Sequence, residues 1–212
     1  MPHYTPPDDN GIQLIYSDKS LLVVNKPAGL LSVPGRGADK QDCLSTRVQK
    51  FFLDALIVHR LDMATSGLLV FARSVEIQRR LSEMFRERLV AKHYVAVVSG
   101  KIASTSGEIN LPIIADWPNR PLRKIDAELG KPSLTRYRVL AQNADTTRVE
   151  LEPVTGRTHQ LRVHLMAIGH SIIGDALYGG QPAERLMLHA RMLDFVHPAS
   201  NSQMRLVCES PF

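Results

Sequence analysis

The sequence predicts an α+β protein built on a largely antiparallel sheet. Several short runs alternate apolar and polar residues or are rich in β-branched side chains, as in HYVAVVSG (93–100), LTRYRVLA (134–141) and TRVELEP (147–153). Other stretches repeat apolar residues at helical spacing. With 212 residues, 44% of them hydrophobic and 22% charged, the chain can bury a full core, and no segment is polar enough for long disorder. We therefore expect one domain.

Three helices are expected, two of them after a capping residue. The first follows Asp42, the second follows Ser74, and the third can be drawn from Thr158 to a stop at Gly169. The side chains that recur at helical spacing are Leu44, Val48, Phe51 and Phe52; Ile77, Leu81, Met84, Phe85 and Arg88; and Leu161, Leu165 and Ile168. In the third helix, His159, Arg162 and Met166 share a different stripe.

The remaining segments are predicted as strands and loops. LLVVN (21–25) enters a Gly-rich turn, LIVHRLD (56–62) leads to the strand GLLVFA (67–72), and QMRLVC (203–208) is a further strand. Residues 110–133 contain four prolines and the only tryptophan of the chain. We expect them to form a long ordered loop, and loops of this length are usually functional.

Cysteine usage and hydropathy favour the cytoplasm. Cys43 and Cys208 are far apart, and neither has a second cysteine at metal-ligand or redox-motif spacing. The N-terminus is Pro-rich and acidic without an apolar signal core, and no run of 18 apolar residues could cross a bilayer. We expect a reduced cytoplasmic protein without a membrane segment.

The charge distribution indicates a polyanionic partner. The net charge is +5, and cations concentrate in two segments, residues 60–92 and 120–138. A basic surface steers nucleic acid toward a protein. The alternative is a solvated helix face with intrahelical ion pairs, which would account for about half of the first cluster.

Metal and nucleotide sites are not supported. His159 and His164 are five residues apart, about 500° around a helix, so they cannot share a face as ligands. A strand would also separate them, and both are expected to be structural or hydrogen-bonding groups. The turn AGLLSVPGRG lacks both phosphate-loop patterns, and no G-x-S-x-G elbow is present. We expect no metal and no cofactor.

One carboxylate, Asp62 in HRLDMATSG (59–67), is the most informative acid. By local rules alone, an Asp before Thr-Ser-Gly caps a turn. The motifs around it change that reading. VNKPAGLLSVPG (24–35), HRLD (59–62), KHYVAVV (92–98), TGRTHQLRVHLMAIGHSIIGD (155–175) and LHARMLDFVHP (188–198) occur in one order. Together they resemble the RluA family of pseudouridine synthases, and HRLDMATSG, DWPNRP and GKPSLTRY resemble the RluA subgroup, which modifies ribosomal RNA and tRNA.

The resemblance implies an isomerase that needs no cofactor and three catalytic residues. Asp62 would be a nucleophile at C1′ or at C6 of the base, or a base at C2′, and the sequence leaves these routes open. An aspartate in water is ionised at neutral pH, as each route requires. Arg162 would be the ion-pair partner of Asp62, although a surface phosphate contact is the alternative. Tyr94 would stack on the target base, or be only a buried strand residue.

The resemblance also indicates substrate-binding residues. Arg60 would fill the space that the extruded uridine leaves, which favours loop uridines because unstacking costs less there. Lys26 and Pro27 would shape the pocket floor, and Leu161 would pack against the base or within the helix. The full set of substrate-binding positions is Arg60, His59, Lys26, Pro27, Leu161 and His159.

The resemblance covers residues 20–207 and implies one catalytic domain around a bent, mainly antiparallel sheet. We expect an N-terminal extension at 1–19, a catalytic domain at 20–212 and no S4 domain, because only about 20 residues precede the first motif. GHSIIGD has Ser171 where the family has proline, and the chain closes in LVCESPF. The expected partner is structured RNA, with no obligate protein partner and a monomeric state. The rivals are a silent RNA-binding or chaperone module and a glycosylase that releases uracil.

Overall fold

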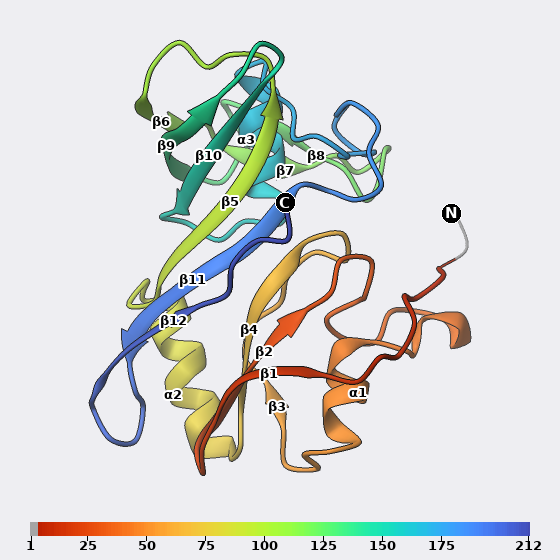
Figure 1. Cartoon of the computed structure of the whole chain (residues 1–212), viewed down its shortest axis with the longest axis vertical. Helices are drawn as coiled ribbons and strands as arrows, with labels where there is room; N and C mark the ends of the chain where they lie inside the picture. Colours follow the sequence, from red (N-terminus) through yellow and green to blue (C-terminus); the bar gives the residue numbers. More distant parts are fainter. Residues whose placement is uncertain (1–3) are drawn as a thin grey trace. The chain divides into compact units, whose positions relative to one another are not determined.

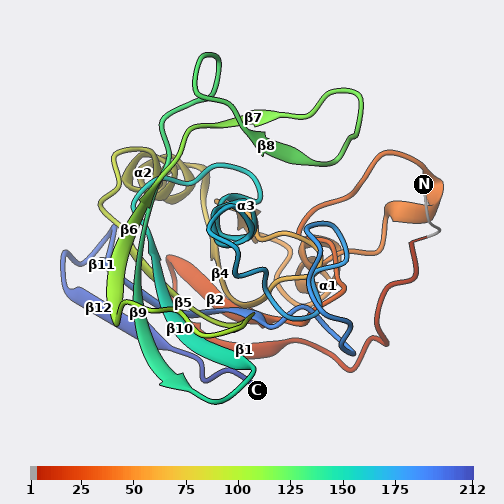
Figure 2. The same cartoon turned by 90° about the horizontal axis from the view of Figure 1, so that it is seen from above.

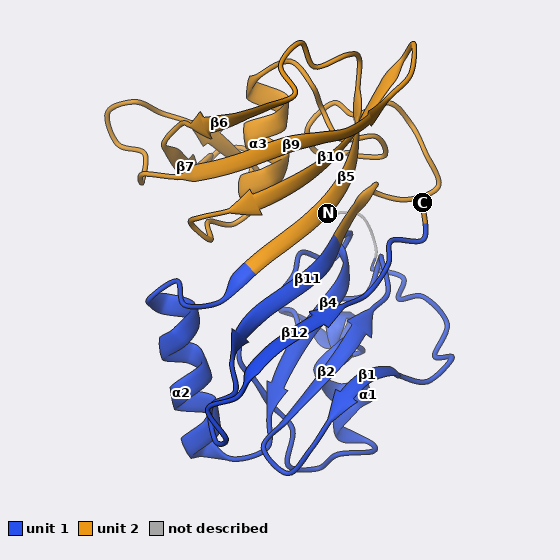
Figure 3. Cartoon of the chain, turned by 60° about the vertical axis from the view of Figure 1, so that its left-hand side comes forward, with its two compact units in different colours: residues 1–91, 190–211 blue, residues 92–189, 212 orange. Residues whose placement is uncertain are grey.

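The structure is a computed structural model of the chain, and it describes residues 4–212. These residues form two compact units (Figure 3). The first unit comprises residues up to Ala91 together with Ala190–Pro211, and the second comprises Lys92–His189 with Phe212. The single domain that the sequence predicts stays a prediction, and each unit is described by itself below.

The first unit is built on antiparallel strand pairs (Figure 1). Strand β2 pairs with β1 and with β4, β3 also pairs with β4, and β11 pairs with β12. Nearly every residue of β2 and β4 is buried, which explains why their sequences are apolar runs without alternation. The strands are β1 (Gln13–Ser17), β2 (Leu21–Lys26), β3 (Leu56–Ile57), β4 (Ser66–Ala72), β12 (Gln203–Val207) and the part of β11 (Leu188–Val196) from Ala190 onward.

Helix α2 (Val75–Arg86) confirms the sequence prediction. The Ser74 hydroxyl accepts a hydrogen bond from the Ile77 N–H at 3.3 Å, as an N-cap should. Ile77 and Leu81 are buried in a core that includes residues of β2, β4, β11 and β12. Arg88 lies beyond the helix with a φ of 61°, so the predicted stripe ends one turn early.

Helix α1 (Leu44–Gln49) differs from its prediction at both ends. Its N-cap is Cys43 rather than Asp42, because Thr46 closes a capping box with Cys43. The Asp42 carboxylate instead accepts two hydrogen bonds from Arg47. The helix ends before Phe51, which is 64% exposed. A short 3₁₀ helix, Ala38–Lys40, precedes it.

The second unit contains an antiparallel sheet in the order β5–β10–β9–β6. Burial alternates strictly along β10, which matches the apolar and polar alternation in its sequence. Helix α3 (Gln160–Ala167) lies between this sheet and a separate hairpin (Figure 2). The strands are β5 (Ala91–Ser99), β6 (Ser106–Asn110), β7 (Ile113–Ala115), β8 (Arg123–Ile125), β9 (Leu134–Gln142) and β10 (Thr146–Pro153).

The predicted long loop at 110–133 contains a β-hairpin, so that prediction is wrong in part. Strands β7 and β8 pair antiparallel over three residue pairs, and all four prolines of the segment lie outside them. Ile113 of β7 is buried against Val163 and Tyr178. This contact joins residues far apart in the sequence, so local patterns could not predict it. Between them, Trp117 is exposed, and the Arg120 guanidinium lies 3.5 Å from its ring centre.

Helix α3 begins at Gln160, two residues later than predicted, and its end confirms the predicted stop. Gly169, just past the helix, has a left-handed φ of +82°. The N–H of the next residue, His170, donates to the Leu165 carbonyl, as at a glycine-terminated helix end. The helix is buried on all sides rather than along one stripe, since every residue from Gln160 to Leu165 is buried. Within residues 4–212, no helix has the length and apolar character needed to cross a membrane.

Candidate active site

The segment 59–65, here called the Asp62 loop, is held by main-chain hydrogen bonds on both sides of Asp62. The Ser32 hydroxyl donates to the Leu61 carbonyl at 2.7 Å and accepts from the Leu61 N–H at 3.1 Å. The Met63 carbonyl accepts from Lys26 Nζ at 3.0 Å and from the Gly29 N–H at 2.9 Å. Asp62 itself is half-buried. Its main chain is therefore fixed through both neighbours.

Lys26 is fully buried at the end of β2, and its ammonium group organises this loop. Nζ donates to the carbonyls of Pro27 at 2.9 Å, Leu30 at 2.6 Å and Met63 at 3.0 Å. Three acceptors match the three N–H groups of an ammonium, and a buried charge needs such partners. Lys26 thus ties the Gly-rich turn to the Asp62 loop, and Pro27 beside it is exposed.

His59 anchors the start of the Asp62 loop. Its Nε2 accepts a hydrogen bond from the Val70 N–H at 3.0 Å, so the proton of the neutral ring is on Nδ1. The ring stacks on Phe85 of α2 with centroids 4.3 Å apart. Arg60 is exposed, and its role toward RNA stays a prediction. The contacts of His59 give it a structural role, and its role toward substrate stays a prediction.

The end of the HRLDMATSG motif is structural. The Thr65 N–H donates to the Asp62 carbonyl at 3.1 Å, which closes the turn that local rules predict. Gly67 has a φ of +113°, and a Cβ there would lie 2.3 Å from the Ala190 carbonyl oxygen. Only glycine fits this position, because the main chains of β4 and β11 approach too closely for a side chain.

In the second unit, Arg162 is 4% exposed and pairs with Asp175. Its Nε and Nη2 donate to the two carboxylate oxygens at 2.7 and 2.6 Å, a bidentate geometry. One of these oxygens also accepts the N–H groups of Leu177 and Tyr178. Sequence reasoning missed Asp175, although it ends the GHSIIGD motif and a buried arginine requires an acid. The pairing of Arg162 with Asp62 stays a prediction.

A buried tyrosine links Arg162 to the hairpin and to His159. The Tyr178 hydroxyl accepts from the Arg123 N–H at 2.9 Å and lies 2.7 Å from His159 Nδ1. The Arg162 guanidinium carbon is 5.1 Å from the centre of the Tyr178 ring. His159 reaches this position from the left-handed conformation, with a φ of 57°. Side chains therefore connect the start of α3 to β8.

Leu161 and Tyr94 lie in the same unit as Arg162. Leu161, in α3, is buried. Burial agrees with the alternative that Leu161 packs within the helix core, and its contact with the base stays a prediction. Tyr94 is half-buried on β5, opposite Leu151 of β10. Of the predicted catalytic residues, Asp62 thus belongs to the first unit, and Tyr94 and Arg162 belong to the second.

His164 confirms its predicted role as a hydrogen-bonding group. Its Nε2 lies 2.9 Å from the Leu111 carbonyl, which can only accept, so Nε2 carries the proton. Nδ1 accepts from the Thr135 hydroxyl at 2.9 Å. Burial lowers the pKa of His164 below its usual range. Among residues 4–212, no three His, Cys, Asp or Glu side chains form a group that could hold a metal ion.

The main chain on both sides of Asp62 is anchored, Arg60 beside it is exposed, and the chain is basic. Together these features fit an enzyme that acts on nucleic acid. Comparison with known proteins defines the class further. Residues 20–167 match a family model described as RNA pseudouridylate synthase. The chain therefore belongs to the RNA pseudouridylate synthase family, and its activity is that of an isomerase.

Individual relatives agree with this family. The chain is 47% identical over 217 residues to the dual-specificity RNA pseudouridine synthase RluA of Escherichia coli K12, covering 100% of this chain and 99% of the relative. It is 49% identical over 204 residues to the Yersinia pestis protein of that name, covering 94% and 99%. The solved structure of human RNA Pseudouridylate Synthase Domain Containing 1 matches with a TM-score of 0.81 and 30% identity, over 98% of this chain and 87% of that one. The α+β fold prediction is confirmed.

Proposed function

We propose that this chain converts loop uridines to pseudouridine in 23S ribosomal RNA and in the anticodon stem-loop of tRNA. The support is the name that full-length relatives at 47 to 49% identity carry, which describes a dual-specificity RNA pseudouridine synthase. Loop uridines are the proposed targets because the enzyme must take the base out of its stack, and that costs less in a loop.

The reaction breaks the N1–C1′ bond of a uridine, turns the base and joins C5 to C1′. No electrons and no atoms are gained or lost overall, because the proton released from C5 is balanced by the proton that N1 takes up. We assign the essential carboxylate to Asp62. The observation that carries this assignment is the anchoring of Leu61 and Met63, which holds Asp62 in one place along the chain. Such preorganisation is what a nucleophile or a base requires.

We propose that Arg162 orients this carboxylate in the enzyme–RNA complex. A guanidinium carries five N–H donors, so pairing with Asp175 does not prevent Arg162 from donating to a second carboxylate. Tyr94 is proposed to stack on the extruded base, with Leu161 against it. Arg60 is proposed to fill the vacated space in the RNA. Pro27 and His159 complete the proposed contacts.

The experiment replaces Asp62 with Asn and maps pseudouridine in labelled 23S ribosomal RNA and tRNA. Asp62→Asn should abolish the reaction, a loss of more than 10³-fold, because the amide is neither a nucleophile nor a base. Asp39→Asn, at an exposed position in the first unit, is the matched control and should leave activity unchanged.

Each other outcome has a distinct meaning. Free uracil would identify a glycosylase. RNA binding with no modification by the wild type would identify a silent binding module. Modified ribosomal RNA with an untouched anticodon loop would remove only the second substrate.

We further propose that the protein acts in the cytoplasm as a monomer, within a catalytic domain at residues 20–212. The absence of closely spaced cysteines supports the compartment. Sedimentation of the purified protein with and without RNA measures the assembly state, and a stable dimer would contradict the proposal.

A further inference from the structure

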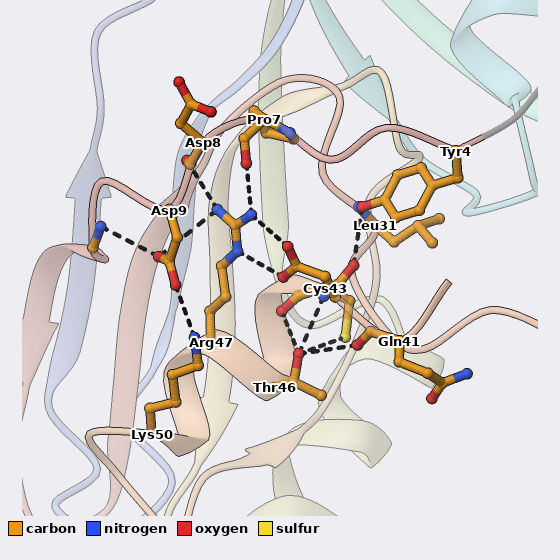
Figure 4. Close-up of polar contacts among 12 residues, drawn as sticks. Tyr4, Pro7, Asp8, Asp9, Leu31, Gln41, Cys43, Thr46, Arg47 and Lys50 are labelled. Atoms are coloured by element: carbon orange, nitrogen blue, oxygen red, sulfur yellow. Dashed lines mark hydrogen bonds and ion pairs between the residues drawn. The ribbon is translucent and has the colours of Figure 1, made fainter. Parts of the chain in front are cut away.

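The N-terminal segment is joined to the Asp62 loop by a continuous path of hydrogen bonds within the first unit. Residues 4–9, here called the strap, contain no helix or strand. They lie beside α1 and the Gly-rich turn, and polar contacts hold them there (Figure 4). Pro7 and Asp8 of the strap line a pocket of about 550 Å³ together with residues that include Leu44 and Arg47. Polar contacts from Tyr4 and Arg47 are among the anchors of the strap.

Arg47 of α1 is the main anchor of the strap. It is 3% exposed, and its Nε and Nη2 donate to the Asp42 carboxylate at 2.8 and 2.7 Å. Its Nη1 donates to the Asp8 carbonyl at 3.1 Å, and Nη2 donates to the Pro7 carbonyl at 2.6 Å. Asp9 lies 3.8 Å from Nη1. One guanidinium therefore joins three consecutive strap residues to the residue that precedes the α1 cap.

Tyr4 connects the strap to the Gly-rich turn. Its side chain is buried, and the hydroxyl donates to the Asp42 carbonyl at 3.0 Å. The same oxygen accepts from the Leu31 N–H at 3.0 Å. Burial raises the pKa of Tyr4, so the hydroxyl keeps its proton and can make both bonds. Tyr4 thus fixes the position of Leu31 relative to the start of α1.

The path continues from Leu31 to Asp62. The N–H groups of Leu44 and Ser45 donate to the carbonyls of Leu31 and Ser32 at 2.8 and 3.2 Å. Ser32 then makes its two bonds to the main chain of Leu61. Leu61 immediately precedes Asp62.

We propose that Tyr4 and Arg47 are positioning residues for the isomerisation, acting on Asp62 through Leu31, Ser32 and Leu61. The proposal rests on the proposed function of Asp62. Neither residue needs to touch RNA. A carboxylate displaced by about 1 Å can lose about 10²-fold in rate, so partial loosening of the path should be measurable as a smaller loss.

The test is Tyr4→Phe, which keeps the ring and removes both hydroxyl bonds. On a 23S stem-loop RNA, kcat should fall about 10-fold while KM changes less than twofold, because binding surfaces are untouched. Tyr16→Phe is the matched control. It removes a hydroxyl bond to Asp18 at 3.0 Å, in the same unit but off the path, and kcat should stay at the wild-type value.

A double variant locates the effect on the path. Ser32→Ala breaks the link to Leu61, so adding Tyr4→Phe to it should lower kcat by less than a further twofold. Losses that multiply would show that Tyr4 acts by another route and would overturn the proposal. Arg47→Lys, which cannot make the bidentate pair, provides a second variant and should also lower kcat with little change in KM.

Hydrogen exchange separates this proposal from the proposed function. In Tyr4→Phe, the amides of Leu31 and Leu61 should exchange faster, and in Tyr16→Phe they should not. A wild-type protein that makes no pseudouridine would refute the proposed function, while the exchange rates would still decide the positioning claim. Unchanged exchange at Leu61 with wild-type kcat would overturn the positioning claim itself.

Discussion

The Asp62 loop and the Arg162 cluster, which consists of Arg162, Asp175, Tyr178 and His159, are held in place by different kinds of contact. Main-chain groups of Leu61 and Met63 are fixed by Ser32, Gly29 and Lys26. Arg162, by contrast, is held through its side chain, which forms a bidentate pair with the Asp175 carboxylate. A main-chain anchor tolerates changes in the anchored side chains, whereas a side-chain pair fails when either partner changes. The two regions should therefore respond differently to substitution.

The largest effect is expected for Asp175→Asn. The amide oxygen can still accept from Leu177 and Tyr178, but Arg162 loses the negative charge of its bidentate partner. Loss of one partner of a buried pair costs about 3–5 kcal/mol. We expect the free energy of unfolding in urea to fall by about that amount and pseudouridine formation to fall with it. Wild-type stability in this variant would contradict the side-chain dependence of the cluster.

A charge-free variant serves as its control. Arg162→Met with Asp175→Leu removes both charges, so most of the lost stability should return. Activity should not return, because no guanidinium is left. Recovery of activity would show that the pair contributes only to folding.

A smaller effect is expected for Lys26→Met in the other region. The substitution removes the ammonium that joins the Gly-rich turn to Met63, although the Gly29 N–H still reaches the Met63 carbonyl. We expect kcat to fall about 10²-fold through misplacement of Asp62. Lys19→Met, at an exposed lysine of the same unit, should have wild-type kcat. Equal kcat in the two variants would show that Lys26 does not help to position Asp62.

The smallest effect is a pH dependence of stability in the second unit. The folded pKa of His164 is lowered by burial, so the unfolded chain binds its proton first as the pH falls below about 6.5. Stability is therefore lost below pH 6.5, until the folded His164 also takes a proton. His164→Gln should reduce the stability difference between pH 7.5 and pH 5.5, because the substituted side chain does not titrate. Urea unfolding at both pH values measures this, and an unchanged difference would contradict it.

Local sequence patterns were sufficient to predict those elements whose structure depends mainly on their own residues. The Ser74 cap and the alternation of β10 are properties of short segments, and both are confirmed. Helix α3 shows the opposite case. Gln160 and His164 lie outside the predicted apolar stripe, yet both are buried, with partners on β9. Those partners lie more than 20 residues away in the sequence, so periodicity cannot reveal them.

The residues of the candidate site also fall into those that the sequence could predict and those that only the structure reveals. Asp62 could be predicted as the catalytic acid because a run of motifs in one order surrounds it. The anchors of its loop could not, since Ser32 and Lys26 act through main-chain carbonyls, which every residue possesses. Asp175 lay within a recognised motif, but only the structure shows the acid paired with Arg162.

The buried pair of Arg162 and Asp175 also has a consequence for how RNA is attracted. Taken together, the two side chains carry no net charge, so they contribute little to the long-range field. Attraction of a polyanion is left to exposed cations such as Arg60 and Lys124. Under the proposed function, capture of the RNA and orientation of the reacting groups would rest on separate sets of charges, and a change in surface charge would alter the first without disturbing the second.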